Sequence, residues 1–266
     1  MSAPATAAAR PSAPGVFLAV LWRDLFVTGR ELPVFLAQVV LQPLFMLFVF
    51  GKVLSSLGYT RPGYTHLLFP GIVALTALLT ALQSTALPLV IEFSFTKEIE
   101  DRLLAPIPVA LVAVEKMVFA ALRALVAALF MFPIGILILG SVPWRLAGAP
   151  LFAGILLLGT LVGGAMGLTM GTLVPPNRIT VMFTLVLTPL LFTGCSQYPW
   201  PSLDQLPWFQ VVTAFNPLTY VSEGMRGALV PGVPHIRPPL CIGALLISLV
   251  LFSAIGIRGF MRQAID

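Results

Sequence analysis

The segment Phe93–Pro108, FSFTKEIEDRLLAPIP, places a dense group of charges between two long apolar stretches. Its charged residues within six positions are Lys97, Glu98, Glu100, Asp101 and Arg102. A charge at the centre of a bilayer costs about 2.5–3.5 kcal/mol even on the mildest insertion scale. This charged segment is therefore expected in water between two membrane spans, as a compact polar protrusion on which a soluble partner can act.

The chain as a whole is much more apolar than a soluble protein. Of its 266 residues, 58% are hydrophobic and 9% are charged, whereas soluble domains carry about 25% charged residues. This composition predicts a polytopic membrane protein without a sizeable soluble domain. In such a protein the net charge of +5 indicates orientation by positive loops rather than binding of nucleic acid.

Six segments approach the length of about 20 mostly apolar residues that a membrane span needs. They are Leu32–Phe50, His66–Ile91, Val109–Leu139, Ala149–Leu173, Ile179–Gly194 and Pro239–Ile257. The fifth is short, and prolines interrupt the apolar stretch that follows it. The expected fold is an all-α integral membrane domain of six transmembrane helices over residues 32–266.

Two shorter segments precede the first span. Residues 1–15 are rich in Ala, Pro, Ser and Thr and are expected to be disordered. Residues 16–31 carry apolar side chains at helical spacing, with Arg23, Asp24 and Arg30 at other positions. This pattern is typical of an amphipathic helix that lies along a membrane surface.

An even number of spans places both termini on the same side of the membrane. If that side is the cytoplasm, the inner basic residues are Arg10, Arg23, Arg30, Lys97, Arg102, Arg178, Arg258 and Arg262. The outer ones are Lys52, Arg61, Arg145, Arg226 and Arg237. This bias of eight to five, which leaves out Lys116 and Arg123 in the third span, favours cytoplasmic termini and a cytoplasmic charged segment.

The region 196–232 is too polar and proline-rich to span, yet too apolar for a plain loop. Within it, Val211–Phe215 and Leu218–Val221 flank Asn216-Pro217. This order predicts a re-entrant pair of short helices that dip into the outer leaflet and return. Broken helices are tolerated at that depth only where they are buried in protein or line a cavity. The alternative is an amphipathic hairpin on the outer surface.

Two motifs carry a family resemblance. Glu98…Leu104-Ala-Pro-Ile-Pro is similar to the Glu-rich cytoplasmic stretch, ending in Leu and Pro, of ABC-2 type transporter permeases. Phe215-Asn-Pro-Leu-Thr-Tyr-Val-Ser-Glu-Gly-Met-Arg resembles their Asn-Pro-Leu-Thr-Tyr…Glu…Arg signature. The order of elements is similar from about Val16 onward, and the chain looks most like the daunorubicin-resistance type. The family's usual Gly-Thr after the first Glu of the charged segment is absent.

The resemblance implies one membrane subunit of a bacterial ABC exporter in the plasma membrane. It implies pairing with a second permease subunit, identical or homologous, and with two cytoplasmic ATPase subunits that grip the coupling helix at 93–108. ATP and Mg are then expected in the partner, with no cofactor in this chain and no enzyme activity of its own. The sequence itself has no phosphate-loop motif and no His, Cys and carboxylate set with metal-binding spacing.

The resemblance also implies roles for two groups of residues. Those expected to couple to the ATPase are Glu98, Glu100, Asp101, Arg102 and Leu104. Those expected at an extracellular gate are Phe215, Asn216, Pro217, Tyr220, Glu223 and Arg226. Glu223 and Arg226 are three positions apart on one helical face, so they are also placed to pair with each other.

Hydroxyl side chains recur on one face of the second span and one face of the fifth. In the resembling family these spans border the translocation path at the subunit junction. The path candidates are Thr76, Thr80, Gln83, Ser84, Thr184 and Thr188. The alternative is that Ser and Thr hydroxyls donate back to carbonyls one turn earlier in their own helix.

Glycines recur every four residues in the fourth span, at Gly159, Gly163, Gly167 and Gly171. They form one flat strip that allows close approach of a neighbouring helix. That neighbour belongs either to the same subunit or to a second subunit.

Charges and thiols near the span ends leave further alternatives. Glu92, Glu115 and Lys116 lie near the inner ends of the second and third spans, and Arg123 either snorkels to the inner interface or binds substrate. The thiols of Cys195 and Cys241, both expected on the outer side, are either buried or joined in a disulfide.

The substrate class follows from the path candidates, which offer only hydroxyls and one amide. A hydrophobic or amphiphilic drug or lipid is favoured over a polysaccharide or glycolipid. An ion-coupled secondary transporter is a further alternative, but it should carry an acidic residue in the middle of a span. A structural membrane subunit would not need the charged segment.

Overall fold

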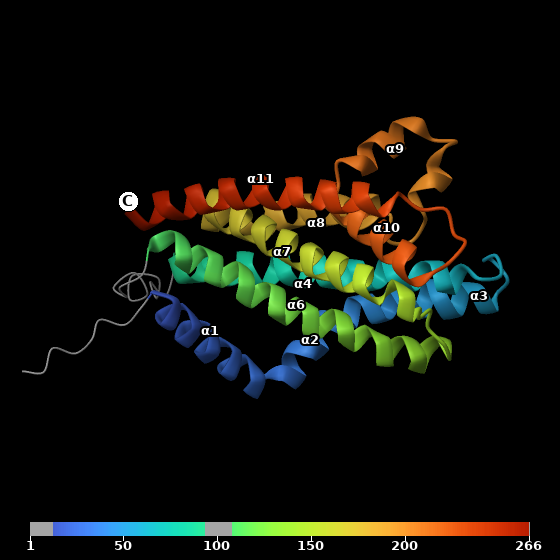
Figure 1. Ribbon diagram of the computed structural model, residues 1–266, viewed down its shortest axis with the longest axis horizontal. Coiled ribbons are helices and arrows are strands. Elements are labelled where there is room, and N and C mark those ends of the chain that lie inside the picture. Colours follow the sequence, from blue (N-terminus) through green and yellow to red (C-terminus); the bar gives the residue numbers. More distant parts are fainter. Residues whose placement is uncertain (1–12, 94–107, 266) are drawn as a thin grey trace, which may run out of the picture.

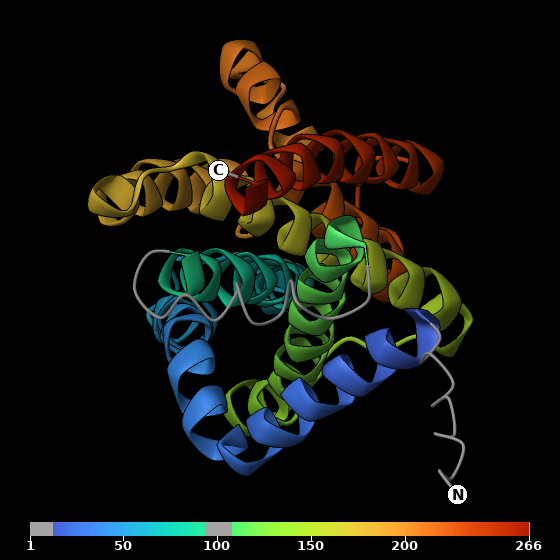
Figure 2. The same cartoon turned by 90° about the vertical axis from the view of Figure 1, so that its left-hand side faces the viewer.

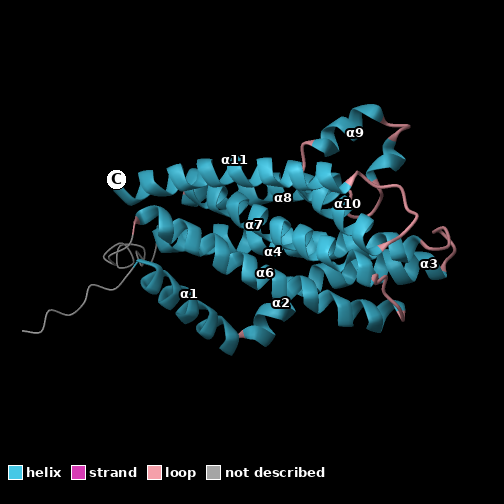
Figure 3. Ribbon diagram, in the orientation of Figure 1, coloured by secondary structure: helices cyan, strands magenta, loops and turns pink. Residues whose placement is uncertain are grey.

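The apolar segments of the sequence fold as helices that run side by side along one direction (Figure 1). The computed structural model describes residues 13–93 and 108–265. Within these residues the chain contains helices, turns and loops but no strand (Figure 3). The α-helices are α1 (Ala13–Arg30), α2 (Leu32–Met46), α3 (Leu54–Ser56), α4 (Tyr64–Ile91), α6 (Val109–Leu139), α7 (Ala149–Leu173), α8 (Ile179–Thr193), α9 (Pro207–Ala214), α10 (Pro217–Leu229) and α11 (Pro238–Ile265). A π-helical stretch, Leu47–Val53, joins α2 to α3, and 3-10 turns occur at Leu146–Gly148, Pro176–Arg178 and Trp200–Leu203.

The described residues include five helical stretches long and apolar enough to cross a membrane. They are Leu32–Ser56, Tyr64–Ile91, Val109–Leu139, Leu146–Leu173 and Pro238–Ala264. The expected fifth span corresponds to α8, which has only 15 residues. At 1.5 Å per residue it is about 22 Å long, against about 30 Å for the hydrocarbon core. It ends because Gly194 and Cys195 leave the helical conformation, Cys195 with a φ of 51°.

The core of the bundle is built around α4, which is buried over most of its length and packs against α6, α7 and α10. The glycine strip of α7 makes this packing close. A Cβ on Gly163 or Gly167 would clash with a backbone carbonyl of α4, and one on Gly171 would crowd Leu89 and Ala86. Gly159 faces Val221 of α10. The strip therefore packs within the subunit, the first of the two expected alternatives.

The N-terminal helix begins at Ala13, three residues earlier than expected, and residues 1–12 lie outside the described part of the chain. It ends at Arg30, where the chain turns into α2 (Figure 2). Leu18, Trp22 and Phe26 form an exposed apolar stripe along α1. That stripe agrees with the expected amphipathic pattern, and its place on a membrane surface stays a prediction.

The two ends of the bundle differ. The end of α4, the start of α6 and the end of α11 lie together at one end, with the start of α1, whereas α9 and α10 lie at the other (Figure 1). The expected coupling residues Glu98, Glu100, Asp101, Arg102 and Leu104 fall in 94–107, outside the described residues.

Candidate functional site

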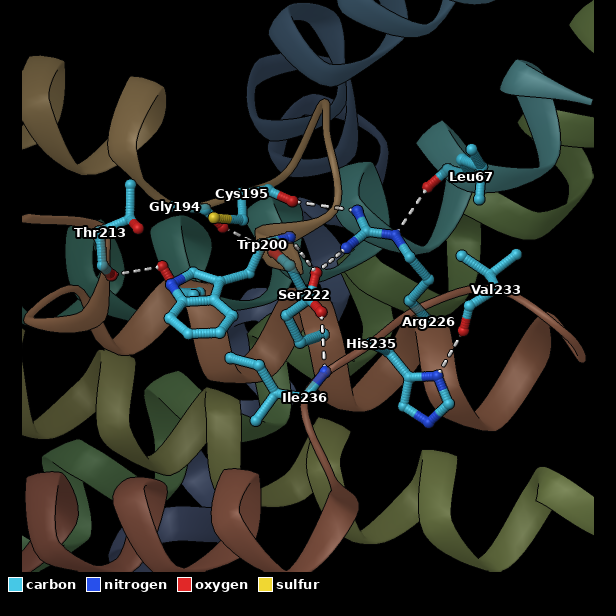
Figure 4. A network of polar contacts seen from close by, with 12 residues as sticks. Leu67, Gly194, Cys195, Trp200, Thr213, Ser222, Arg226, Val233, His235 and Ile236 are labelled. Carbon is cyan, nitrogen blue, oxygen red and sulfur yellow. Dashed lines mark hydrogen bonds and ion pairs between the residues drawn. The ribbon is translucent and has the colours of Figure 1, made fainter. Parts of the chain in front are cut away.

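Arg226 of α10 is the largest fully buried side chain among the described residues, with 0% of its surface exposed. A guanidinium without access to water is tolerated only where its N–H groups find acceptors. Its Nη1 pairs with the carboxylate of Glu223. Its Nη2 donates to the Cys195 carbonyl at 3.0 Å and its Nε donates to the Leu67 carbonyl at 3.3 Å (Figure 4).

Glu223 is also 0% exposed and accepts from two further donors. The backbone N–H of Trp200 donates to Oε1 and that of Ile236 to Oε2, each at 3.0 Å. We call Glu223, Arg226 and these four backbone partners the α10 network. It joins the start of α4, the loop after α8, the 3-10 turn at Trp200 and the segment before α11 (Figure 4).

Arg226, Cys195 and Tyr198 keep their protons near neutral pH. Burial lowers the pKa of Arg226 while Glu223 raises it, and a guanidinium stays charged in proteins. Burial raises the pKa of the Cys195 thiol to about 11 and that of Tyr198 to about 12. Cys195 and Cys241 are buried free thiols rather than a disulfide, and the protonated Cys195 thiol is a poor nucleophile.

Asn216 joins the end of α8 to the start of α10. Its Oδ1 accepts from the Leu218 N–H at 2.9 Å and so caps α10, in which Pro217 occupies the first position. Its Nδ2 donates to the Leu190 carbonyl and to the Thr193 hydroxyl, both at 2.9 Å. The side chain of Asn216 thus pairs with a backbone C=O at the C-terminal end of α8 and with a backbone N–H at the N-terminal end of α10.

Hydroxyl groups attach α10 to its neighbours in the same way. Thr219 donates to the Thr213 carbonyl at 2.7 Å, and Ser222 donates to the Gly194 carbonyl at 3.0 Å. Thr219 and Ser222 are not among the residues predicted from the sequence. A signal was present, because positions 219, 222, 223 and 226 have the i, i+3, i+4, i+7 spacing of one helix face and all four are polar.

Five of the six predicted gate residues gather at the start and along the buried face of α10. Asn216, Pro217, Glu223 and Arg226 are buried and Tyr220 is half-buried. The predicted pairing of Glu223 with Arg226 is confirmed. Phe215 differs, because 85% of its surface is exposed. The predicted break at Asn216 separates α9 from α10, while the re-entrant depth and the gate role stay predictions.

Family comparison agrees with the residues that build this network. The model of the ABC-2 type transporter family matches residues 15–230. The chain belongs to this family. The match includes both the charged segment and the Asn216–Arg226 signature.

Curated relatives of this ABC-2 protein carry transport permease names. Transport permease ycf38 of Cyanophora paradoxa is 28% identical over 221 residues, which are 79% of this chain and 72% of the relative. Its namesake in Porphyra purpurea is 28% identical over 214 residues, 77% of this chain and 71% of the relative. The inner membrane transport permease YadH of Escherichia coli K12 is 25% identical over 211 residues, 78% and 79% of the two chains.

The six path candidates of this ABC-2 protein do not share one surface of the subunit. Thr76 and Thr80 are buried, Gln83 and Ser84 are half-buried, and Thr184 and Thr188 are exposed on α8. Two of the hydroxyls bond to their own helix, as the alternative expects. Thr76 donates to the Ile72 carbonyl at 2.8 Å, and Thr184 donates to the Thr180 carbonyl at 3.2 Å.

An ion pair lies at the opposite end of α4 from the α10 network. The Nζ of Lys116 on α6 lies 2.5 Å from Oε1 of Glu92, directly after α4. Both residues are buried, with 7% and 8% of their surfaces exposed. The pair ties together the two helices that flank residues 94–107. This pairing is not predicted from the sequence, although Glu92 directly precedes the charged segment and Lys116 follows it by eight residues.

Proposed function

We propose that this ABC-2 permease is the membrane subunit of an ATP-driven exporter in the bacterial plasma membrane. It pairs with a second permease subunit, and two cytoplasmic ATPase subunits bind the charged segments of the pair. The substrate is a hydrophobic or amphiphilic drug or lipid. Both termini face the cytoplasm, and α8 serves as a short sixth span beside the second subunit.

One observation carries this proposal: α4 is a buried helix fixed at both ends by charged groups. At one end Glu92 is paired with Lys116, next to the charged segment. Near the other end the Leu67 carbonyl accepts from Arg226. With 28 residues α4 is about 42 Å long, which exceeds the hydrocarbon thickness of about 30 Å. A displacement of the charged segment can therefore reach the α10 network along one rigid element.

The mechanism we infer is alternating access. Nucleotide binding closes the two ATPase subunits, and the charged segments that they hold move together. The helices α4 and α6 carry this movement to α10, and the α9–α10 region then opens the outer gate. The exposed Thr184 and Thr188 on α8 suit a path that borders a second subunit rather than one enclosed by a single chain.

Charge reversal in the charged segment tests the partner interaction. We expect the variant Glu98→Lys, Glu100→Lys, Asp101→Lys to lose the ATPase subunit when the tagged permease is purified from its own host. The same variant should remain folded, with an unchanged elution volume, because the core that the structure describes is formed by helices within residues 13–93 and 108–265. Asp204→Lys, an exposed acidic residue at the other end, is the matched control. Full retention of the ATPase by the triple variant would contradict the proposal.

A further inference from the structure

A groove between the α1–α2 elbow and α6 combines an apolar wall with a single charge. Its volume is about 400 Å³, and we call it the elbow groove. Figure 2 shows α1 and α2 meeting beside α6. The lining includes Leu25, Leu32 and Phe35 from the elbow, and Arg123, Val126 and Leu129 from α6. Arg123 is the one charged residue among those that line it.

Arg123 has donors to spare, in contrast to Arg226. Within the part of the chain that the structure describes, no hydrogen bond joins Arg123 to another residue, and its Nε is buried without an acceptor. Its guanidinium carbon lies 4.1 Å from the centre of the Phe35 ring, a cation–π contact that holds the group against the wall of the groove. Glu31 at the elbow attracts it electrostatically but is exposed to the surroundings. A planar guanidinium with free donors is well suited to bind a phosphate.

The apolar wall continues from the elbow groove along α2. A second groove of about 630 Å³ shares Leu32 with it and is lined by Leu36, Val40 and Leu44 of α2 and by Phe130 and Ile134 of α6. Its wall carries no charged residue. The two grooves together offer one cationic end followed by a long apolar trough, which matches a ligand with an anionic head and a hydrocarbon tail.

The length of α6 places Arg123 near a membrane interface. With 31 residues α6 is about 46 Å long, so roughly a third of it extends beyond a hydrocarbon core of about 30 Å. The buried charges of Glu115 and Lys116 mark the end that extends. Arg123 lies seven residues further, about 10 Å along the helix. From there a long side chain can reach the headgroup layer, while the trough along α2 runs toward the bilayer centre.

We propose that the elbow groove binds an anionic membrane phospholipid, with its phosphate on Arg123 and an acyl chain in the trough between α2 and α6. The lipid completes the hydrogen bonding of Arg123 and fills the space between the elbow and α6. The bound molecule is a resident lipid of the elbow, so the proposal does not depend on which substrate is exported.

Native mass spectrometry of the purified full-length chain tests this site. The protein is titrated with phosphatidylglycerol or phosphatidylcholine, and the fraction of lipid-bound protein gives an apparent Kd for each. We expect Arg123→Gln to weaken phosphatidylglycerol binding about tenfold, the size expected for one charge-assisted contact. Phosphatidylcholine has the same phosphodiester, but its choline cation offsets the charge, so it should bind more weakly than phosphatidylglycerol and lose less affinity in Arg123→Gln. Arg237→Gln, at an exposed arginine away from the groove, should match the wild type.

Two further variants keep the test informative if Arg123→Gln folds poorly. Arg123→Lys should retain a preference for phosphatidylglycerol, because the charge remains. Leu129→Trp fills the groove with the charge intact and should weaken phosphatidylglycerol binding. The proposal is overturned if Arg123→Gln and the wild type bind phosphatidylglycerol equally, since the apolar trough alone would then be responsible. It is also overturned if the wild type binds both lipids equally well, since the site would then not select an anionic headgroup.

Discussion

At the scale of single residues, Glu223 and Arg226 are each tolerated in the interior because of the other. Neither is exposed, and backbone groups from four segments complete their hydrogen bonds. Breaking a buried pair by removing one partner leaves an uncompensated charge and typically costs about 3–5 kcal/mol, whereas replacing both charges costs much less. The pair therefore fixes how the segments around α10 meet, more than it adds stability.

This argument predicts unequal effects for single and double replacements. Arg226→Met should lower the free energy of unfolding by about 3–5 kcal/mol, because Glu223 and the Leu67 and Cys195 carbonyls lose their donor. The double variant Glu223→Gln, Arg226→Met should recover part of that loss. The measurement is reversible unfolding in mixed micelles, with the exposed Arg145→Met as control. A double variant less stable than Arg226→Met alone would contradict this argument, because the two charges would then stabilise the fold beyond offsetting the cost of each other's burial.

At the scale of elements, the spacing between α4 and α7 depends on residues that have no side chain. Gly163 and Gly167 face backbone carbonyls of α4, which cannot move aside as a flexible side chain would. Gly154 lies in the same helix but has nothing within 4 Å of the position a Cβ would take. The same substitution therefore has different consequences at two sites in α7.

We expect Gly167→Val to destabilise the protein by at least about 1–3 kcal/mol, since an overpacked core must shift backbone or side chains. Gly154→Val should change stability by less than about 1 kcal/mol, because only helix propensity is affected there. The difference is measured as the melting temperature of each variant. Samples are heated to a series of temperatures, and the fraction that still elutes as a monodisperse peak is recorded. Equal melting temperatures for both would mean that α7 does not pack on α4 as closely as described.

At the scale of the whole molecule, the long apolar helices could be predicted closely from the sequence. Val109–Leu139 and Ala149–Leu173 begin and end as expected, because a run of 20 or more apolar residues is a strong signal. The α10 network could be predicted only in part. Its two side chains show helical spacing, but their partners are backbone groups of Leu67, Cys195, Trp200 and Ile236, which carry no residue-type signal.

The sequence alone does not predict where α8 ends or which neighbour the glycine strip of α7 faces, because both depend on contacts between segments that are distant in the chain. The end of α8 is stabilised by Asn216, more than 20 residues later in the chain, through a contact that only the fold brings about. The strip on α7 is equally suited to a neighbour in the same subunit or in another. Only the position of α4 decides between them, because its carbonyls of Leu78 and Leu82 occupy the strip.

The proposed dependence of transport on a separate ATPase is best measured in inside-out membrane vesicles that contain this permease with or without the proposed phosphate-loop ATPase partner. The readout is accumulation of amphiphilic fluorescent dyes and a fluorescent phospholipid after addition of ATP or of a proton gradient. We expect ATP-dependent accumulation only when both proteins are present, and none for the triple charge-reversal variant of the charged segment. Uphill accumulation by the permease alone, driven by the proton gradient, would contradict the view that this chain is a passive gate moved by a separate ATPase.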